Sequence, residues 1–347
     1  MPVKYSIIIP VYNSRQYLDD CTAGILAIPE RDIEILLIDD GSTDGSAELC
    51  DQLARKDSRV RALHQTNRGV SEARNRGIQE AAGEMLLFFD ADDTVSTESL
   101  QKMLFQTIPG CPSDLFIFGM SFDTYHHGLL QNQNTLLPPF SGAKDREELE
   151  KFLLQLFYAN SLSSLCNKVF FRELLESHQL WLKPDMIQFE DLDFMLRYLA
   201  VCRRVSFVRE CIYHYRQSET VDKARDRLQR IPDLSAVVSV IKASLEALCS
   251  SSEAFDQAKE IVISIYSLLA GEKVHYESVS GIRKICRDFS AWKQANHVSL
   301  GKDDPKVLRM MERNAVFSIW IRSRLSGLAG RLRGLRRVLS RRKVSLD

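Results

Sequence analysis

Four apolar runs alternate with helix-like stretches in the first hundred residues, and this alternation constrains the fold more than any other feature. The runs are YSIIIPVYN at 5–13, IEILLIDDGSTDGS at 33–46, VRALHQ at 60–65 and EMLLFFDADD at 84–93. Nearly continuous apolar strands are typical of a parallel sheet that helices cover on both faces. The sequence therefore predicts an α/β fold with a mostly parallel sheet.

The stretches between these runs predict the crossover helices. They span 15–28, 43–56 and 70–82, and Ser42 or Thr43 is the expected N-cap of the second helix.

Beyond residue 110 the periodicity changes, and the expected boundary between a mixed sheet domain and a helical region falls near 218–226. The predicted elements are a strand at 114–122, a polar excursion without periodicity at 123–140, helices at 145–158 and 164–176, a helix in the second half of 186–200, a strand pair at 204–216, and mostly helix at 225–295.

Polar side chains gather where the predicted strands end. They are Asn13, Asp39, Asp40, Asp90, Asp92 and Asp93. In open parallel sheets the ligand crevice lies outside these strand ends. Three carboxylates within four positions repel one another, and a hard divalent cation such as Mg²⁺ or Mn²⁺ would neutralise them. For Asp93 alone we favour a helix N-cap, but not for Asp90 and Asp92.

Several classes of protein lose support from the sequence. It has neither a G-x-G-x-x-G after the first strand nor a P-loop, which disfavours a standard dinucleotide oxidoreductase or P-loop enzyme. Lys plus Arg and Asp plus Glu are 46 each, so no net charge favours nucleic acid as a partner. Eight cysteines without a C-x-x-C pair and without a secretory segment predict a cytoplasmic protein. No apolar run is long enough to span a membrane.

Four motifs, in this order and spacing, resemble family-2 glycosyltransferases of the GT-A fold. They are SIIIPVYN, LLIDDGSTDGS, NRGVSEARNRG and DADD. The resemblance continues through NKVFFRELL (167–175), FEDLDF (189–194) and YHYR (213–216), as in many bacterial polysaccharide-building members, and covers about residues 3–218.

The resemblance implies a GT-A (nucleotide-diphospho-sugar transferase) domain with a Rossmann-like, mixed sheet over residues 1–220. Residues 1–110 would form the nucleotide-sugar-binding half and 111–220 the acceptor-binding half. Residues 221–347 would form a helical C-terminal extension.

In the family, a D-x-D motif holds a divalent metal, Mn²⁺ or Mg²⁺, against the diphosphate of a nucleotide-sugar, most often a uridine diphosphate sugar. Carried over, Asp92 is the expected metal ligand, while contacts of Asp93 and His214 with the metal stay open. The expected donor-binding residues are Pro10, Val11, Tyr12 and Asn13 in the loop after the first strand, Asp40, Arg74, Asp90 and Ala91.

Three of these donor residues have defined roles in the family. Asp90 would touch the ribose or the sugar. Asp40 would accept a hydrogen bond from the imide of the base, with Asp39 as the neighbouring candidate. Arg74 would reach the nucleotide with its charged fork, although it also reads as an ordinary surface arginine on an amphipathic helix.

FEDLDF supplies the expected catalytic residue. Inverting transfer needs a base that removes the proton of the acceptor hydroxyl, and in relatives the Asp of a Glu-Asp pair does this, which makes Asp191 the candidate. An alternative interpretation is that Glu190 and Asp191 are acidic residues that interact with the dipole at a helix N-terminus. Relatives often have Trp before NK, where this chain has Cys166.

The C-terminal stretch 316–344 combines basic residues with apolar residues at partly helical spacing. Eleven basic residues lie between Arg309 and Lys343. Such a segment favours peripheral contact with an anionic membrane, here the inner face of the plasma membrane, over a solvated tail. Membrane contact would suit a lipid-linked acceptor.

The sequence thus predicts an inverting, metal-dependent glycosyltransferase that moves a sugar from a nucleotide-sugar to a saccharide or lipid-linked acceptor. Two alternatives stay open: a nucleotidyltransferase, which also places metal-binding carboxylates at strand ends, and a non-catalytic protein that binds nucleotide or glycan.

Overall fold

The computed structural model describes residues 3–126, 129–186, 188–217, 234–273, 279–295 and 310–311. The chain divides into two compact units, Met1–Thr220 with Ile241–Lys259, and Val221–Val240 with Glu260–Asp347. The basic segment predicted at 316–344 lies outside the described residues.

The parallel part of the sheet follows the four predicted runs. It contains β1 (Tyr5–Val11), β2 (Ile33–Asp39), β3 (Val60–His64) and β4 (Met85–Phe88), in the spatial order β3-β2-β1-β4. Every residue of β2 is buried, as expected for a strand covered on both faces. The crossover helices are α1 (Leu18–Leu26), α2 (Ser46–Lys56) and α3 (Val70–Glu80), so the predicted α/β fold is confirmed.

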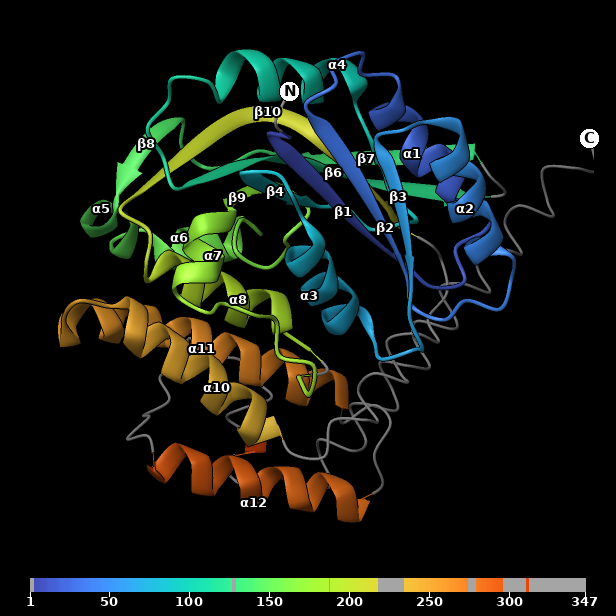
Figure 1. Ribbon diagram of the computed structural model, residues 1–347. Coiled ribbons are helices and arrows are strands. Elements are labelled where there is room, and N and C mark those ends of the chain that lie inside the picture. The colour runs from blue at the N-terminus through green and yellow to red at the C-terminus, as the bar shows by residue number, and fades with distance from the viewer. Residues whose placement is uncertain are drawn as a thin grey trace, which may run out of the picture. The chain divides into compact units, whose positions relative to one another are not determined.

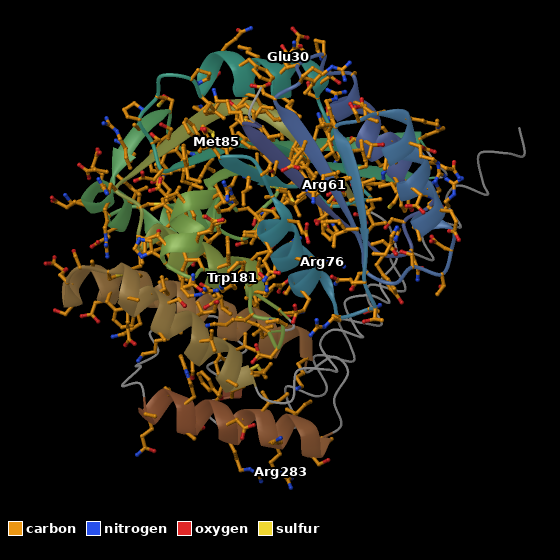
Figure 2. The ribbon with its side chains drawn as sticks, viewed as in Figure 1. Glu30, Arg61, Arg76, Met85, Trp181 and Arg283 are labelled. Carbon is orange, nitrogen blue, oxygen red and sulfur yellow. The ribbon has the colours of Figure 1, made fainter. Side chains whose placement is uncertain are left out.

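The two faces of this sheet bury alternate side chains of each strand. Ile7 and Ile9 belong to the core cluster that includes α1 and α2, whereas α3 covers the other face (Figure 1). There α3 lies so close that a Cβ on Gly77 would stand 2.3 Å from Cγ2 of Ile8. Arg61 on β3 holds the end of α3, because its guanidinium donates to the carbonyl and the carboxylate of Glu80 at 2.8 and 2.9 Å (Figure 2).

The second part makes the sheet mixed. β9 (Lys168–Phe171) runs antiparallel to both β4 and β6 (Leu115–His126), and β10 (Arg204–Gln217) pairs in parallel with β6. The short β5 (Thr94–Val95) pairs with β10. β7 (Leu129–Leu136) pairs with β6, and β8 (Gly142–Asp145) pairs with β10. Among the described residues these ten strands form one sheet.

Three sequence predictions were wrong in this part. The excursion at 123–140 is largely the end of β6 and the antiparallel β7. The helix predicted at 164–176 is β9 followed by α7 (Arg172–Ser177). The strand pair at 204–216 is the single strand β10, whose pairing with β6 shifts register between Val208 and Tyr213. Such a bulge interrupts side-chain alternation as a turn would, and thus resembles a turn in the sequence.

Two predicted N-caps were also wrong. α2 begins after Gly45, whose φ of 90° is in the left-handed region that favours glycine. Asp93 caps no helix, because β5 follows it and Ser96 is the N-cap of α4 (Thr97–Lys102). Helix α4 continues into the π-helix η1 (Met103–Thr107). Three further helices of this part of the chain are α5 (Arg146–Glu150), α6 (Leu153–Tyr158) and α8 (Glu190–Leu199).

The predicted helical C-terminal extension is confirmed within the described residues. Its helices are α10 (Leu234–Leu248), α11 (Ser252–Lys273) and α12 (Val279–Ala295). In the second unit the ring of Tyr266 packs 4.9 Å from that of Trp292 and 5.0 Å from that of Phe289. In the part of the chain that the structure describes, no helix is long and apolar enough to cross a membrane.

Candidate active site

The strand ends carry the predicted polar residues to one edge of the sheet, where Asn13 and Asp40 order the neighbouring loops. Oδ1 of Asn13 accepts from the Thr43 N–H at 2.8 Å. The buried carboxylate of Asp40 accepts from Nε2 of Gln65 and from the N–H groups of Arg68 and Gly69, each at 2.8 Å. Asp40 therefore fixes the loop between β3 and α3.

The expected donor loop after the first strand is shorter than predicted. Pro10 and Val11 belong to β1, where they pair with Ile38 and Asp39, and the Val11 side chain is buried in the core. Tyr12 is 51% exposed, and Asn13 has a φ of 50°. Of these four residues, only Tyr12 and Asn13 lie beyond the strand with side chains free of the core.

Arg74 joins the two carboxylates that the sequence placed in separate motifs. Its Nη2 donates to Oδ1 of Asp90 and its Nη1 donates to Oδ1 of Asp191, both at 2.8 Å. The Arg74 side chain is only 5% exposed, so the reading as an ordinary surface arginine is wrong. Burial alone would lower the pKa of Arg74, but Asp191 and Asp90 raise it, so the guanidinium stays charged.

Asp191 lies in the first turn of α8, directly after an unusual backbone conformation. Phe189 has a φ of 62°, which is uncommon for a bulky residue and turns the chain into the helix. Burial raises the pKa of the Asp191 carboxyl, while Arg74 acts in the opposite direction. The result is a partly desolvated carboxylate held by the Arg74 guanidinium.

Asp93 is the buried member of the acidic loop. It is 1% exposed and accepts from the Tyr213 hydroxyl at 2.5 Å and from the Arg216 N–H at 2.7 Å. Burial, with Asp90 and Asp92 close by, raises the pKa of Asp93 to about 8. Asp93 therefore anchors the loop to β10, and Ala91 beside it is also buried.

Asp92 is half-buried, and its main-chain carbonyl accepts from Nε of Arg216 at 3.1 Å. Within the described ranges, no three His, Cys, Asp or Glu side chains form a ready-made group of metal ligands. Mg²⁺ in phosphate-binding sites commonly takes one or two carboxylates and fills its other positions with substrate oxygens and water. The oxygen donors of this loop fit a cation held in that way, through Asp92.

His214 contacts another carboxylate. Its Nδ1 lies 3.1 Å from Oδ2 of Asp123 on β6, and Oδ1 of the buried Asp123 accepts from the Ser121 hydroxyl at 2.5 Å. Gln133 on β7 also reaches Asp123, at 3.3 Å. The structure thus gives His214 a partner within the sheet.

Sequence reasoning missed several residues that contact the carboxylates of Asp90 and Asp93. Sγ of Cys166 donates to Oδ2 of Asp90 at 3.5 Å, and Tyr213 and Arg216 hold Asp93. All three lie in or next to the NKVFFRELL and YHYR motifs, which were the available signal. The second Asp of FEDLDF, Asp193, is fully buried and pairs with Lys183 and Arg197, so its role is structural.

The arrangement of the sheet matches a solved structure, that of S. aureus TarS 1–349 in complex with UDP-GlcNAc. The TM-score is 0.67 at 16% sequence identity, over 94% of this chain and 92% of that chain. At this identity the likeness establishes the fold alone, and the fold is the GT-A fold.

Sequence comparison relates part of the chain to a family of glycosyltransferases. Residues 6–108 match the model of glycosyl transferase family 2. The putative glycosyltransferase EpsH and the uncharacterized glycosyltransferase EpsJ of Bacillus subtilis (strain 168) are 29% and 32% identical over 213 and 216 residues. Each alignment covers 61% of this chain, and the chain spans 60% and 61% of the length of these relatives. Residues 6–108 of this chain thus resemble glycosyl transferase family 2.

Proposed function

We propose that the protein is an inverting, metal-dependent glycosyltransferase that moves a sugar from a nucleotide-sugar, a uridine diphosphate sugar, to an acceptor hydroxyl. The observation that carries this proposal is the guanidinium of Arg74, which donates to Asp90 of the D-x-D motif and to Asp191 of α8, each at 2.8 Å. The two carboxylates therefore lie close together. A donor-side carboxylate and a candidate base next to each other are what single-displacement transfer requires.

Asp191 is the proposed general base. Its carboxylate would take the proton of the acceptor hydroxyl while that oxygen bonds to the anomeric carbon from the face opposite the leaving group. The bond from the anomeric carbon to the diphosphate oxygen breaks with its electron pair, so the configuration inverts. Burial of Asp191 supports this role, because a carboxylate with a raised pKa is a stronger base.

The donor would lie along the edge formed by the ends of β1, β2 and β4. Tyr12 and Asn13 would face the nucleoside, Asp40 the base, and Asp90 with the main chain at Ala91 the ribose or sugar. Arg74 supports a phosphate or sugar contact, because its buried Nε–H has no hydrogen-bond partner among the described residues. An unsatisfied buried donor is costly, and a ligand oxygen would remove that cost.

Asp92 would hold the Mn²⁺ or Mg²⁺ ion, which when bound stabilises the negative charge of the departing diphosphate as a Lewis acid. This chain's contribution is to keep Asp92 near Asp90 while Asp93 is used to anchor the loop. Arg216 fixes that loop through Asp92 and Asp93.

The acceptor is proposed to be a saccharide or lipid-linked glycan of bacterial surface polysaccharide synthesis, bound mainly by residues 111–220. This part of the proposal rests on the family resemblance. A lipid-linked acceptor would agree with a cytoplasmic protein that touches the inner face of the plasma membrane through 316–344.

The test is release of nucleoside diphosphate from a panel of nucleotide-sugars with Mn²⁺ or Mg²⁺, for the wild type and for Asp92→Asn. We expect release with one donor class, loss of release in chelator, and loss in the variant. Pyrophosphate release would identify a nucleotidyltransferase instead. Nucleotide binding without turnover of any donor would identify a binding protein, and full turnover in chelator would contradict the metal assignment.

A further inference from the structure

The acidic loop of the DADD motif is a tight turn that β10 holds at both ends. Within the loop, the Asp93 N–H donates to the Asp90 carbonyl at 3.1 Å. The Tyr213 hydroxyl donates to the Asp93 carboxylate and accepts from the Asp90 N–H at 3.0 Å. The Arg216 N–H donates to the other carboxylate oxygen of Asp93 at 2.7 Å. These four bonds fix the two ends of the turn, and Asp92 between them has a contact of its own.

The side chain of Arg216 supplies that contact. Its Nε donates to the main-chain carbonyl of Asp92 at 3.1 Å. The direction of this carbonyl depends on the ψ angle of Asp92, so the bond restrains the direction in which the Asp92 side chain leaves the main chain. The bond from Arg216 to Asp93 comes from a main-chain N–H, so it would survive replacement of the Arg216 side chain. The guanidinium therefore acts on Asp92 separately from Asp93.

Two tyrosine rings hold the Arg216 guanidinium. Its Cζ lies 4.6 Å from the ring centroid of Tyr125, in β6, and 5.2 Å from that of Tyr17, directly before α1. Both distances are in the range of a cation–π contact. Asp20 also pairs with Nη2 of Arg216 at 3.5 Å, but its side chain is 66% exposed, and such a pair contributes little. The rings, rather than this ion pair, keep the guanidinium in place.

We propose that Arg216 is a positioning residue for Asp92, and that Tyr17 and Tyr125 keep its guanidinium in the orientation that sets the affinity of Asp92 for the metal. The inference rests on the proposed function, because it assigns the residues that place the metal ligand of that reaction. Arg216 touches neither donor nor acceptor in this scheme and acts through the acidic loop alone.

The test measures binding of Mn²⁺ in the presence of UDP, by electron paramagnetic resonance of the unbound ion. Arg216→Met should weaken Mn²⁺ binding roughly tenfold or more, because a charge-assisted hydrogen bond at Asp92 is lost. Turnover should fall at limiting Mn²⁺ and recover most of the way at saturating Mn²⁺. A merely structural role would lower turnover at every Mn²⁺ concentration with the Mn²⁺ affinity unchanged, and that result would overturn the inference.

The two rings provide a second test. Tyr17→Phe and Tyr125→Phe keep a ring beside the guanidinium and should bind Mn²⁺ as the wild type does. Tyr17→Leu and Tyr125→Leu remove the ring, and each should weaken Mn²⁺ binding about two- to fivefold. In an Arg216→Met background the same Leu variants should cause no further loss, because the group through which they act is gone. Additive losses would contradict the inference.

Arg209→Met is the matched control. Arg209 lies on the same strand, and its Nη1 donates to the main-chain carbonyl of Pro138 at 2.7 Å, as Nε of Arg216 does to that of Asp92. We expect wild-type Mn²⁺ binding in this variant. Equal losses of affinity in Arg209→Met and Arg216→Met would mean that any disturbance of β10 weakens the metal site, and would overturn the inference.

Two outcomes separate this inference from the proposed function. If Arg216→Met binds Mn²⁺ as tightly as the wild type, the inference fails and the proposed function stands. If the wild type binds no Mn²⁺ and turns over no donor, the proposed function fails, and hydrogen exchange of the amides at residues 90–94 still tests the hold of Arg216 on the loop. These amides should exchange faster in Arg216→Met than in Arg209→Met, and equal exchange would contradict the inference.

Discussion

Arg74 and Asp191 lie 117 positions apart in the chain, and Nη1 of Arg74 donates to Oδ1 of Asp191 at 2.8 Å. The same guanidinium holds Asp90 at the same distance. A buried cation between two carboxylates is the electrostatic centre of the site, and the first prediction concerns it.

Arg74→Lys should lower the free energy of unfolding by about 3 kcal/mol, because one ammonium cannot replace the two-pronged contact and a buried carboxylate loses its partner. Urea unfolding measures this change. Arg76→Lys on the same helix is the control, since Arg76 is half-buried and its Nη1 donates to the neutral carbonyl of His64. Equal stability losses in the two variants would mean that the pairing of Arg74 contributes nothing specific.

Asp191→Asn should lower turnover on the order of 10²-fold or more, because the proposed general base is removed while the proposed donor residues remain. Nucleoside diphosphate should bind about as tightly as before, as calorimetry would show. Glu190→Gln, one position away in the same turn of α8, should lose far less turnover. Weak nucleotide binding with near-normal turnover in Asp191→Asn would identify Asp191 as a structural residue.

Gly77→Ala should destabilise the protein by about 1–3 kcal/mol, because it overpacks the contact between α3 and β1. The added Cβ would stand 2.3 Å from Cγ2 of Ile8. Gln79→Ala, at an exposed position of the same helix, is the control, and thermal and urea unfolding are the measurements. A Gly77→Ala variant as stable as the wild type would show that α3 can move away from the sheet at little cost.

Lys168 should make stability depend on pH above neutrality. Burial lowers the pKa of Lys168 from 10.5 to about 7 in the folded chain, so between these values the unfolded state binds more protons. Stability from this group therefore rises with pH across that window, by at most about 1.4 kcal/mol per pH unit. Below this pH window Lys168 is charged in both the folded and the unfolded state, so the cost of burying its ammonium group no longer changes with pH.

This pH dependence should be missing from Lys168→Met. Urea unfolding of both proteins from about pH 6 to about pH 9 measures the difference, and other titrating groups cancel in the comparison. Parallel stability curves for the two proteins would mean that Lys168 stays charged throughout the window.

Removal of residues 316–347 should weaken binding to anionic vesicles and make the remaining binding less sensitive to salt, because each Lys or Arg near such a surface contributes about 1 kcal/mol. The cut follows Met311, which is buried and should be kept. Donor turnover should persist, since the donor motifs precede residue 100. Co-sedimentation measures the binding, and unchanged binding would identify a solvated tail.

Much of the parallel part of the sheet was predictable. The strands β1 to β4 are continuous apolar runs, and parallel topology alone places the residues that follow them at one edge. The later elements were harder, because β10 carries a bulge and because much of β7 is exposed and polar, which gives no periodic signal. β9 is four residues long and runs directly into α7, so the sequence there reads as one helix.

The sequence by itself determined the α/β class, the acidic edge and the resemblance to a family, because strand periodicity and motif order are carried by neighbouring residues. Only the tertiary structure decided what each carboxylate does. Asp93 is used as an anchor because Tyr213, 120 positions later, donates to it, and Asp191 meets Asp90 only through Arg74. Charge, burial and hydrogen bonding act over a few ångströms of space, and no local pattern in the chain records which distant residues will share that space.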